Sequence, residues 1–361
     1  MEICIDARMI QSSGIGTVIR NTIPFLPGFL KTLIVKPDYE MRESNQVLVQ
    51  CGAPIYSIKE QVSLPKAIPR CDLFWSPHYN VPLMPIRAKK RVVTIHDACH
   101  LAMKATLGWK ERLYAEVMFR QAASRSDAIV TDSEFSKYEL CKFLSVREDQ
   151  IQVIYPGVDV ERFSKQPSQE ERERLRGKYA LPDAFYLSVG NVKPHKNLAA
   201  ILDVYERYDM EIPLVVIGRK SGLRTLDPAM NRIEKSPRLR EQVFLVDQVS
   251  DQELVWFYHM AVGLVFPSLY EGFGLPPLEA MAAGCPAVVS NRASLPEVCG
   301  DAALLVDPDK REELADGMRR IARESGLRRE LVEKGKVRAR SFSWERTGRE
   351  YAKKFEKTFL S

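Results

Sequence analysis

Short apolar runs rich in β-branched residues alternate along the chain with longer stretches in which apolar residues repeat at helical spacing. The short runs predict strands at residues 3–7, 47–51, 72–77, 91–97, 128–133, 151–156, 185–190, 213–218, 243–247, 262–268, 286–290 and 303–307. The longer stretches predict helices at 113–123, 133–144, 251–260 and 308–323. Because the strands are almost continuously apolar and alternate with helices, we expect parallel sheets covered on both faces.

The predicted strands fall into two sets, separated by the polar, charged segment 160–182. A chain of 361 residues is long for one hydrophobic core and suits two domains. We therefore predict an α/β fold of two Rossmann-like, doubly wound domains, residues 1–165 and 166–342. The last segment, 343–361, is predicted to be a helix that docks through an aromatic stripe. This stripe consists of Trp344, Tyr351, Phe355 and Phe359.

Apolar residues make up 45% of the sequence and charged residues 28%, as in ordinary soluble proteins. No apolar run approaches the roughly 20 residues of a membrane helix, and the first ten residues lack the pattern of a signal peptide. The seven cysteines show no CxxC spacing, which indicates reduced thiols. We therefore expect a cytoplasmic protein.

The net charge of +6 is too small to suggest nucleic-acid binding, but segment 87–120 holds eight basic and three acidic residues. Within residues 100–121, Trp109 and aliphatic side chains mix with Lys104 and Lys110, a composition that suits the headgroup region of an anionic bilayer. We expect peripheral contact with the inner face of the plasma membrane through residues 100–121. The alternative is a helix with a core-facing stripe and ordinary solvated lysines.

Ligands of open α/β sheets bind beyond the carboxyl ends of the strands, so we expect the site in the cleft between the two domains. In the first domain, Gly14 and Gly16 follow the first strand and open a helix, where the backbone can approach an anion. A tight strand–helix turn that binds nothing explains them equally well. His96 and Asp97 end a later strand, where a histidine is well placed for chemistry; a buried, structural histidine is the alternative.

No metal is expected. His96, Cys99 and His100 have side chains that bind metals, but no second ligand cluster completes a tetrahedral site. The sequence Asp307-Pro308-Asp309 opens a predicted helix, and its first aspartate is interpreted as the helix N-cap.

In the second domain, Gly190 ends a strand, and Lys193 and Lys196 then approach the start of a helix. Two lysines at this position can neutralise a diphosphate. Arg219 follows the next strand and adds positive charge to the same edge. The alternative is that both lysines are solvated loop residues.

The sequence EGFGLPPLE, residues 271–279, follows a buried strand and begins the next helix. Glu271 lies beside the turn Gly272-Phe273-Gly274, and the amides of Phe273, Gly274 and Leu275 are expected to face the cleft. Two prolines suit the first helical turn, and we place Glu279 in that turn. Such a loop can hold a polyhydroxylated ligand, because carboxylates accept from hydroxyls while amides donate. Alternatively, Glu279 only complements the helix dipole and Glu271 is a surface residue.

These residues resemble the retaining glycosyltransferases of family four, which use nucleotide-sugar donors on a GT-B fold of two Rossmann-like domains. The strongest match is EGFGLPPLE with its continuation AMAAGCPAVVSNRASLPEV. The motifs SGIG, TIHD, TDSEFSK, VIYPGVD, KPHKN and FSWE match in the family's order and extend the resemblance over nearly the whole chain. The resemblance implies an acceptor domain, a donor domain and a final helix that crosses back to the first domain.

Site residues are implied in the same way. Glu271, with the amides of Phe273 and Gly274, would bind hydroxyls of the donor sugar, and Glu279 those of the ribose. Lys196 and the Gly16 amide would meet the diphosphate, and His96 the sugar near its C6 hydroxyl. Many relatives have an arginine where this chain has Asn191, so Lys193 or Arg219 must supply that charge. Val249 and Asp251 lie where relatives contact the base, although Asp251 is equally a helix cap.

The resemblance implies a hexose transferred with retention, without a metal or other cofactor, by front-face attack rather than through a covalent intermediate on Asp97. It favours GDP-mannose as donor and a saccharide or polyprenyl-diphosphate-linked saccharide as acceptor, as in O-antigen assembly. UDP-linked glucose, galactose or N-acetylglucosamine are alternative donors. An epimerase, a phosphorylase or a catalytically silent nucleotide-sugar-binding protein are alternative functions.

Overall fold

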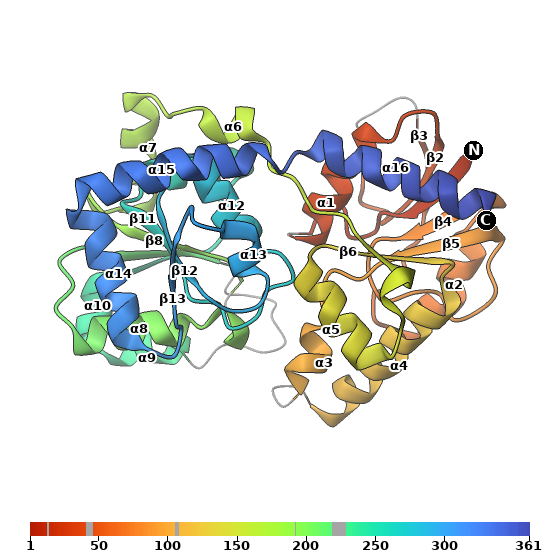
Figure 1. The fold of residues 1–361 in the computed structure, drawn as a ribbon, viewed down its shortest axis with the longest axis horizontal. Helices are drawn as coiled ribbons and strands as arrows, with labels where there is room; N and C mark the ends of the chain where they lie inside the picture. Colours follow the sequence, from red (N-terminus) through yellow and green to blue (C-terminus); the bar gives the residue numbers. More distant parts are fainter. Residues whose placement is uncertain (13, 41–45, 105–107, 192, 219–228) are drawn as a thin grey trace. The chain divides into compact units, whose positions relative to one another are not determined.

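A computed structural model describes residues 1–12, 14–40, 46–104, 108–191, 193–218 and 229–361. The chain forms two compact units (Figure 1). Unit 1 consists of Met1–Gly157 together with Trp344–Ser361, and unit 2 consists of Val158–Ser343. Each unit is described separately below.

The described part of unit 1 contains a parallel sheet of seven strands in the order β3-β2-β1-β4-β5-β6-β7. Its strands are β1 (Glu2–Asp6), β2 (Leu30–Val35), β3 (Gln46–Gln50), β4 (Cys71–Ser76), β5 (Ala88–Thr94), β6 (Ala128–Thr131) and β7 (Ile151–Val153). Its helices are α1 (Ile15–Thr22), η1 (Ile23–Phe25), α2 (Ile58–Ala67), α3 (Cys99–Ala102), α4 (Trp109–Arg125), α5 (Glu134–Leu144), η3 (Glu148–Gln150) and α16 (Trp344–Leu360).

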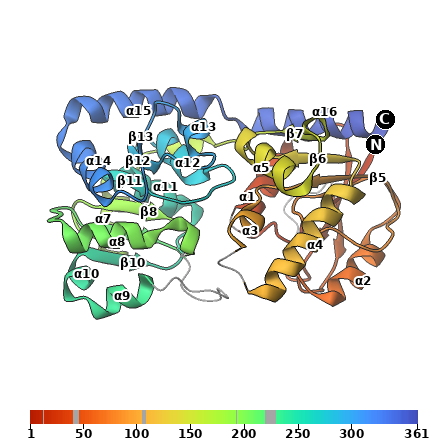
Figure 2. The ribbon, with the colours of Figure 1, turned by 60° about the horizontal axis from the view of Figure 1, so that its bottom comes forward.

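Helices cover both faces of this sheet, as the apolar strands predict. Successive strand residues point to opposite faces, so Ile3 and Ile5 pack with α1 and α16, whereas Cys4 packs with α2. Residues of α4 and α5 cover the second face farther along the sheet, over β5 to β7. Figures 1 and 2 show α16 and α4 on opposite sides of the sheet.

Strand β2 was not predicted. Only its last three residues, Leu33 to Val35, are buried, and the preceding residues are exposed or half-buried. Such a short apolar run gives little sequence signal. Strand β5 also begins earlier than predicted and ends at Thr94, so His96 and Asp97 lie in the loop after it.

The last helix, α16, belongs to unit 1, which confirms that the chain crosses back to its first half. Tyr351 and Phe355 are buried among β-strand side chains, and their rings contact the Trp75 ring at centroid distances of 4.9 and 5.5 Å. The Tyr351 hydroxyl lies 2.9 Å from Thr94 Oγ1, within hydrogen-bond distance. The aromatic stripe therefore anchors this helix.

Unit 2 contains a second parallel sheet, of six described strands in the order β10-β9-β8-β11-β12-β13. The strands are β8 (Tyr186–Val189), β9 (Leu214–Ile217), β10 (Val243–Val246), β11 (Gly263–Phe266), β12 (Ala287–Ser290) and β13 (Leu304–Val306). The helices are α6 (Val160–Ser164), α7 (Gln169–Tyr179), η4 (Pro194–Lys196), α8 (Leu198–Arg207), α9 (Ala229–Lys235), α10 (Pro237–Gln242), α11 (Asp251–Met260), α12 (Leu275–Ala282), α13 (Leu295–Cys299), α14 (Arg311–Arg323) and α15 (Ser325–Arg340).

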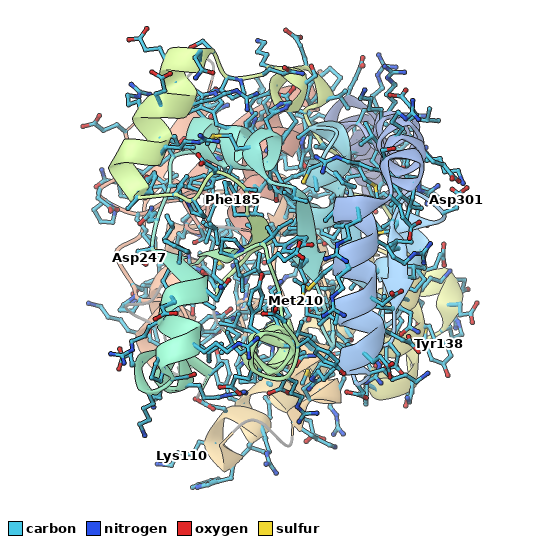
Figure 3. The ribbon with its side chains drawn as sticks, turned by 90° about the vertical axis from the view of Figure 1, so that its left-hand side faces the viewer. Lys110, Tyr138, Phe185, Met210, Asp247 and Asp301 are labelled. Atoms are coloured by element: carbon cyan, nitrogen blue, oxygen red, sulfur yellow. The ribbon has the colours of Figure 1, made fainter. Side chains whose placement is uncertain are left out.

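The core of unit 2 lies between this sheet and its helices. Residues of α8, α10 and α14 form one apolar cluster with Leu214 and Val216 of the sheet. Phe185 and Met210, both labelled in Figure 3, are buried, with 0% and 4% of their surface exposed. Phe185 contacts Phe257 of α11, with ring centroids 6.2 Å apart.

The boundary between the units falls after Gly157, eight residues before the predicted one. Helix α6 already belongs to unit 2, because Phe163 is buried against Tyr258 of α11, with ring centroids 6.0 Å apart. The Phe163 carbonyl also lies 2.8 Å from His259 Nε2. Because polar residues surround Phe163 in the sequence, its burial could not be predicted from the local pattern.

Candidate functional site

Lys196 and Glu271 form an ion pair at the carboxyl edge of the sheet in unit 2. Lys196 Nζ donates to both carboxylate oxygens of Glu271, at 2.7 and 2.9 Å. The lysine side chain is 23% exposed and the glutamate side chain 11%. Both side chains are thus partly shielded from water, where a charge pair is stronger than on an open surface.

The backbone around Lys196 is held in an unusual conformation. Gly190 has a φ of 140°, and a Cβ atom there would lie 3.5 Å from Lys196 Cε. Asn197 has a φ of 56°, in the left-handed region, and its side-chain amide donates to the Pro267 carbonyl at 3.1 Å. These contacts place the lysine directly beside the loop that carries Glu271.

Two serines outside the predicted site organise the Glu271 loop. Ser268 Oγ lies 2.5 Å from Glu271 Oε1 and 2.9 Å from the His195 carbonyl. Ser294 Oγ lies 2.9 Å from the Glu271 carbonyl and 2.7 Å from the Phe273 carbonyl. The serine in the sequence PSLYEGFG, directly before the motif, is a signal that could have identified the first of them.

The sheet topology explains why this pair forms. Strands β9 and β10 lie on one side of β8, and β11, β12 and β13 lie on the other. The order of strands therefore reverses between β8 and β11, where ligands of open α/β sheets characteristically bind. Lys196 follows β8 and Glu271 follows β11, so the two residues come from the two sides of this switch point.

Glu279 lies deeper in the helix than predicted. It is the fifth residue of α12, whose first turn holds no acidic residue. Glu279 therefore does not complement the helix dipole in the first turn. The Tyr258 hydroxyl donates to Glu279 Oε2 at 3.0 Å. Burial raises the pKa of Glu279, and the bond from Tyr258 and the charge of Arg162 offset only part of this effect.

Helix α12 begins with both predicted prolines and with no side-chain cap. Gly274 has a φ of 115°, and a Cβ atom there would lie 2.8 Å from Leu295 Cδ2, so glycine is required. Phe273 is buried, with its ring 5.6 Å from that of Phe342. The Phe273 side chain is thus structural, and only its backbone suits ligand contact.

The remaining predicted donor residues have different outcomes. Gly272 is buried and Leu275 half-buried in the same loop. Lys193 is exposed just before η4, and Val249 is half-buried between β10 and α11. Arg219 lies outside the described residues. Their contacts with a donor therefore stay predictions.

Gly14 and Gly16 in unit 1 are explained by the turn that they form. Gly14 has a φ of 65° directly before α1. A Cβ atom at Gly16 would lie 2.6 Å from the Met9 carbonyl oxygen, so only glycine fits. Neither feature needs a ligand, and an approach of the Gly16 amide to a diphosphate stays a prediction.

His96 has both ring nitrogens engaged. Nδ1 lies 2.7 Å from Asp132 Oδ2, and Nε2 lies 2.9 Å from the Pro77 carbonyl oxygen. Burial lowers the pKa of His96, but the charge and hydrogen bond of Asp132 outweigh this, and the net pKa is raised. With a carboxylate and a carbonyl as partners, both nitrogens donate in the imidazolium form. Asp132 was missed by sequence analysis, although it ends a predicted strand.

Two helix caps differ from those predicted. Ser250, rather than Asp251, caps α11 and forms a capping box with Glu253. Helix α14 begins at Arg311, so Asp307 is not its N-cap; its carboxylate instead accepts from the Asp309 amide at 3.1 Å. Among the residues that the structure describes, no three His, Cys, Asp or Glu side chains group into a potential metal site.

Each unit is thus a doubly wound α/β fold with a parallel sheet, and the polar groups of unit 2 gather at the switch point of its sheet. Two family models match consecutive segments: "Glycosyltransferase Family 4" matches residues 47–162 and "Glycosyl transferases group 1" matches residues 171–338. The sucrose-phosphate synthase of Thermosynechococcus elongatus has a similar structure, with a TM-score of 0.79 and 18% identity over 99% of both chains. The chain belongs to the family-four glycosyltransferases and has the GT-B fold.

Relatives with assigned activities are similar over part of the sequence. Serotype-specific mannosyltransferase WbdA of Escherichia coli is 30% identical over 268 residues, which are 72% of this chain and 32% of that protein. O-antigen chain mannosyltransferase B of Escherichia coli is 29% identical over 267 residues, 73% of this chain and 69% of that protein. The chain therefore spans about a third of the length of WbdA.

Proposed function

We propose that this glycosyltransferase moves a hexose, with retention of anomeric configuration, from a nucleotide sugar to a saccharide or lipid-linked saccharide in surface-polysaccharide or O-antigen synthesis. GDP-mannose is the favoured donor, since the relatives named above are mannosyltransferases. The proposal depends mainly on the Lys196–Glu271 pair, which joins a cation and a hydroxyl acceptor at the switch point of unit 2.

The hydrogen bonds of this pair leave capacity for a ligand. An ammonium group has three N–H donors, and Lys196 directs two of them to Glu271. The third can bind a phosphate oxygen. Glu271 Oε1 accepts from both Lys196 and Ser268, whereas Oε2 accepts from Lys196 alone among the described residues. Oε2 can therefore also accept from a sugar hydroxyl while the ion pair stays intact.

Glu279 suits the ribose of the donor. Its carboxylate already accepts from Tyr258 and has a second oxygen for the vicinal hydroxyls of a ribose. The amides of the first turn of α12 have no side-chain cap and favour an anion near the helix start. The resulting proposal is a donor held by two carboxylates through its hydroxyls and by Lys196 through its diphosphate.

The proposed reaction breaks the bond between the anomeric carbon and the β-phosphate oxygen and forms a bond to an acceptor hydroxyl oxygen. The departing nucleoside diphosphate carries away the electron pair of the broken bond. Its phosphate oxygen also takes up the proton of the acceptor hydroxyl. Lys196 stabilises the negative charge that develops on this leaving group. His96, as an imidazolium, is proposed to add positive charge that stabilises the same leaving group. Asp97 is not proposed to form a covalent intermediate.

A panel of nucleotide sugars in a thermal-shift assay tests the donor. The correct donor at a hundred times its Kd should add about 2.7 kcal/mol of stability. Release of the nucleoside diphosphate with a mannose-containing acceptor, and NMR of the product anomer, test transfer and retention. Activity in excess EDTA tests the proposed independence from metal. Tight binding without turnover on any acceptor would instead support a silent binding protein, and isomerised donor an epimerase.

A specific feature of α4 supports the further proposal that the protein contacts an anionic membrane. Trp109, Leu113 and Val117, four residues apart, form an apolar stripe on this helix and are 71%, 58% and 43% exposed. Leu113 and Val117 therefore face solvent, whereas the alternative interpretation of this helix required an apolar stripe that faces the core. Lys110 lies 5.4 Å from the Trp109 ring, and Figure 3 shows its side chain at the surface.

Basic and aromatic groups on one helix face suit anionic headgroups, where a lipid-linked acceptor would be found. In the described part of the chain, no helix is both long and apolar enough to span a bilayer. Flotation with liposomes containing phosphatidylglycerol should retain the protein. Replacing Trp109 and Leu113 with glutamate should release it, while Tyr138→Glu, on the exposed face of α5, should not. No flotation with any anionic lipid would contradict the membrane proposal alone.

A further inference from the structure

A fully buried ionic network lies at the carboxyl edge of the sheet in unit 1. Arg8 Nε donates to Asp6 Oδ1 at 2.7 Å, and Arg8 Nη2 donates to Glu60 Oε1 at 2.5 Å. The side chains of all three residues are 0% exposed. Removing charges from water is costly, and such pairs often stabilise a protein less than apolar packing would. The network therefore indicates a role other than stability.

The network fixes two tyrosines. Glu60 Oε2 accepts from the Tyr56 amide at 2.7 Å and from Asn80 Nδ2 at 2.6 Å. Asn80 Oδ1 in turn accepts from the Tyr114 hydroxyl. Tyr56 has a φ of 65°, a left-handed conformation that is strained for a non-glycine residue and persists only where its surroundings impose it. Glu60 supplies that constraint.

The fixed tyrosines belong to a group that we call the tyrosine cluster, comprising Tyr56, Tyr79 and Tyr114. The Tyr56 ring lies 6.1 Å from that of Tyr79 and 6.2 Å from that of Tyr114, between centroids. Tyr56 is 39% exposed and the other two are half-buried, so the cluster is open to solvent. Burial raises the pKa of each tyrosine, so their hydroxyls stay protonated. The Tyr114 hydroxyl already donates to Asn80 Oδ1, and its oxygen can still accept from a ligand hydroxyl.

A carboxylate accompanies the cluster. Asp97 is half-buried in the loop after β5, just before α3, and the His100 ring of α3 lies 5.6 Å from the Tyr79 ring between centroids. Asp97 Oδ1 accepts from the Cys99 amide at 2.8 Å, whereas Oδ2 has no hydrogen-bond partner in the described part of the chain. The cluster therefore combines aromatic rings, hydroxyl groups and a carboxylate acceptor.

The cluster is attached to the switch point of its sheet. Strands β2 and β3 lie on one side of β1, and β4 to β7 lie on the other. Asp6 ends β1, and His78 and Asn80 follow β4; His78 Nε2 lies 3.2 Å from Asp6 Oδ2. In addition, Arg8 Nη1 is buried without a partner among the described residues, and buried donors of this kind usually bond to water or a ligand.

We infer that the tyrosine cluster and Asp97 bind one hexopyranose unit of the acceptor saccharide. The rings offer apolar faces to the C–H groups of a pyranose, and Asp97 and the tyrosine hydroxyls offer partners for its hydroxyls. The buried network holds these groups in place before the saccharide binds, which reduces the cost of ordering them. This inference depends on the proposed function, because it assigns the acceptor of the same reaction.

A purely structural cluster would differ in one respect. It would not need a strained backbone at its most exposed member, Tyr56, since a surface tyrosine can adopt an ordinary conformation. In addition, Asp97 Oδ2 has no donor among the described residues and can accept from a ligand hydroxyl. Strain and an available acceptor beside solvent-exposed aromatic rings are the features of a carbohydrate-binding surface.

Saturation-transfer NMR with methyl α-mannoside, methyl α-glucoside, methyl α-galactoside and methyl N-acetylglucosaminide tests the inference on the full chain. At least one glycoside should receive saturation from the aromatic protons of the wild type. Tyr56→Ala and Asp97→Asn should each weaken its binding about tenfold, equivalent to about 1.4 kcal/mol. Tyr138→Phe, on a 64% exposed tyrosine of α5, should bind as the wild type does.

Tyr114→Phe guards against a folding defect, because it leaves the ring in place and removes only the hydrogen bond to Asn80. It should weaken binding, since Asn80 and Glu60 help to position the cluster, while the melting temperature stays within a few degrees of the wild type. Wild-type affinity in all folded variants of the tyrosine cluster and Asp97, or no binding of any of the four glycosides to the wild type, would overturn the inference. Failure of the proposed function is separate and would appear as no stabilisation of the wild type by any nucleotide sugar.

Discussion

Lys196 Nζ lies 2.7 and 2.9 Å from the two carboxylate oxygens of Glu271, although 75 residues separate them in sequence. Each residue leaves the carboxyl end of a different strand, and the two strands are neighbours only because the sheet order reverses between them. A cation and a hydroxyl acceptor are thereby positioned together before any ligand binds. The donor site that we propose is in this sense preorganised.

The first prediction concerns the coupling of this pair. Glu271→Gln and Lys196→Met should each lower the free energy of unfolding, by about 1.5–3 kcal/mol, since each removes charged hydrogen bonds and leaves a partly shielded partner. The double variant should lose less than the sum, because neither charge then remains unpaired. Urea unfolding of the four proteins measures the coupling. Strict additivity would show that the pair does not interact in solution.

The same variants should separate the two ligand roles. Lys196→Met should weaken the binding of both nucleoside diphosphate and nucleotide sugar, since its proposed partner is the diphosphate. Glu271→Gln should weaken the nucleotide sugar more than the free nucleoside diphosphate, since its proposed partner is the sugar. Calorimetric titration measures both affinities. Equal losses for both ligands in both variants would contradict the assignment of Glu271 to the sugar.

A second prediction uses the glycine that precedes α12. Gly274→Ala should destabilise the protein by about 1–3 kcal/mol, because φ is 115° there and the new methyl group would overlap Leu295. It should also weaken donor binding, since the α12 amides would shift. Gly177→Ala is the matched control: Gly177 lies within α7 with open space around it, and alanine there should stabilise the helix slightly. Thermal unfolding of both variants tests this contrast, and similar melting shifts would contradict it.

Much of the fold follows from local sequence patterns, whereas the candidate site in unit 2 depends on which distant segments the fold brings together. The buried run before EGFGLPPLE predicted β11 and the loop that carries Glu271, and glycine and proline predicted the start of α12. Pairing of Glu271 with Lys196 could not be predicted from either segment, because it requires the order of β8 and β11. Strand β2 was missed because its first three residues are exposed or half-buried, which leaves only a short apolar run.

The buried network and the tyrosine cluster of unit 1 were harder still to predict from sequence. Tyr56 and Glu60 occupy the segment PIYSIKEQ, whose pattern indicates no chemistry, and their relation to Arg8 appears only in the folded chain. Arg8 did offer a signal, since a charged residue directly after a buried strand needs a partner. Asp132 offered the same signal at the end of β6. Charged residues that directly follow apolar strands are therefore the part of the sequence that best indicates these buried pairs.

A third prediction concerns the protonation of His96. Because its pKa in the folded protein is raised above the ordinary value of 6.5, the charged pair with Asp132 stabilises the fold fully below about pH 6.5 and loses this effect as pH rises through the folded pKa. The difference in unfolding free energy between the wild type and Asp132→Asn should therefore shrink with increasing pH. NMR titration of the imidazole should also show a lower pKa in this variant. Asp183→Asn, at an almost fully exposed site, should change neither quantity. An unchanged His96 titration in Asp132→Asn would contradict the assigned cause.

The last prediction links Glu279 to donor binding through pH. Burial raises the pKa of Glu279 above its ordinary value of 4.5, so the folded protein binds a proton that the unfolded chain releases, and this group makes the fold less stable as pH rises through that window. Ribose hydroxyls that donate to the ionised carboxylate would lower its pKa again. Donor binding should therefore release protons, and donor affinity should increase with pH between 4.5 and the raised pKa.

Glu279→Gln should abolish this increase of donor affinity with pH. Tyr258→Phe should shift it to higher pH, because the hydroxyl that favours the charged carboxylate is lost. Calorimetry in buffers of different ionisation enthalpy counts the protons released, and a pH-independent affinity in the wild type would remove Glu279 from the donor site.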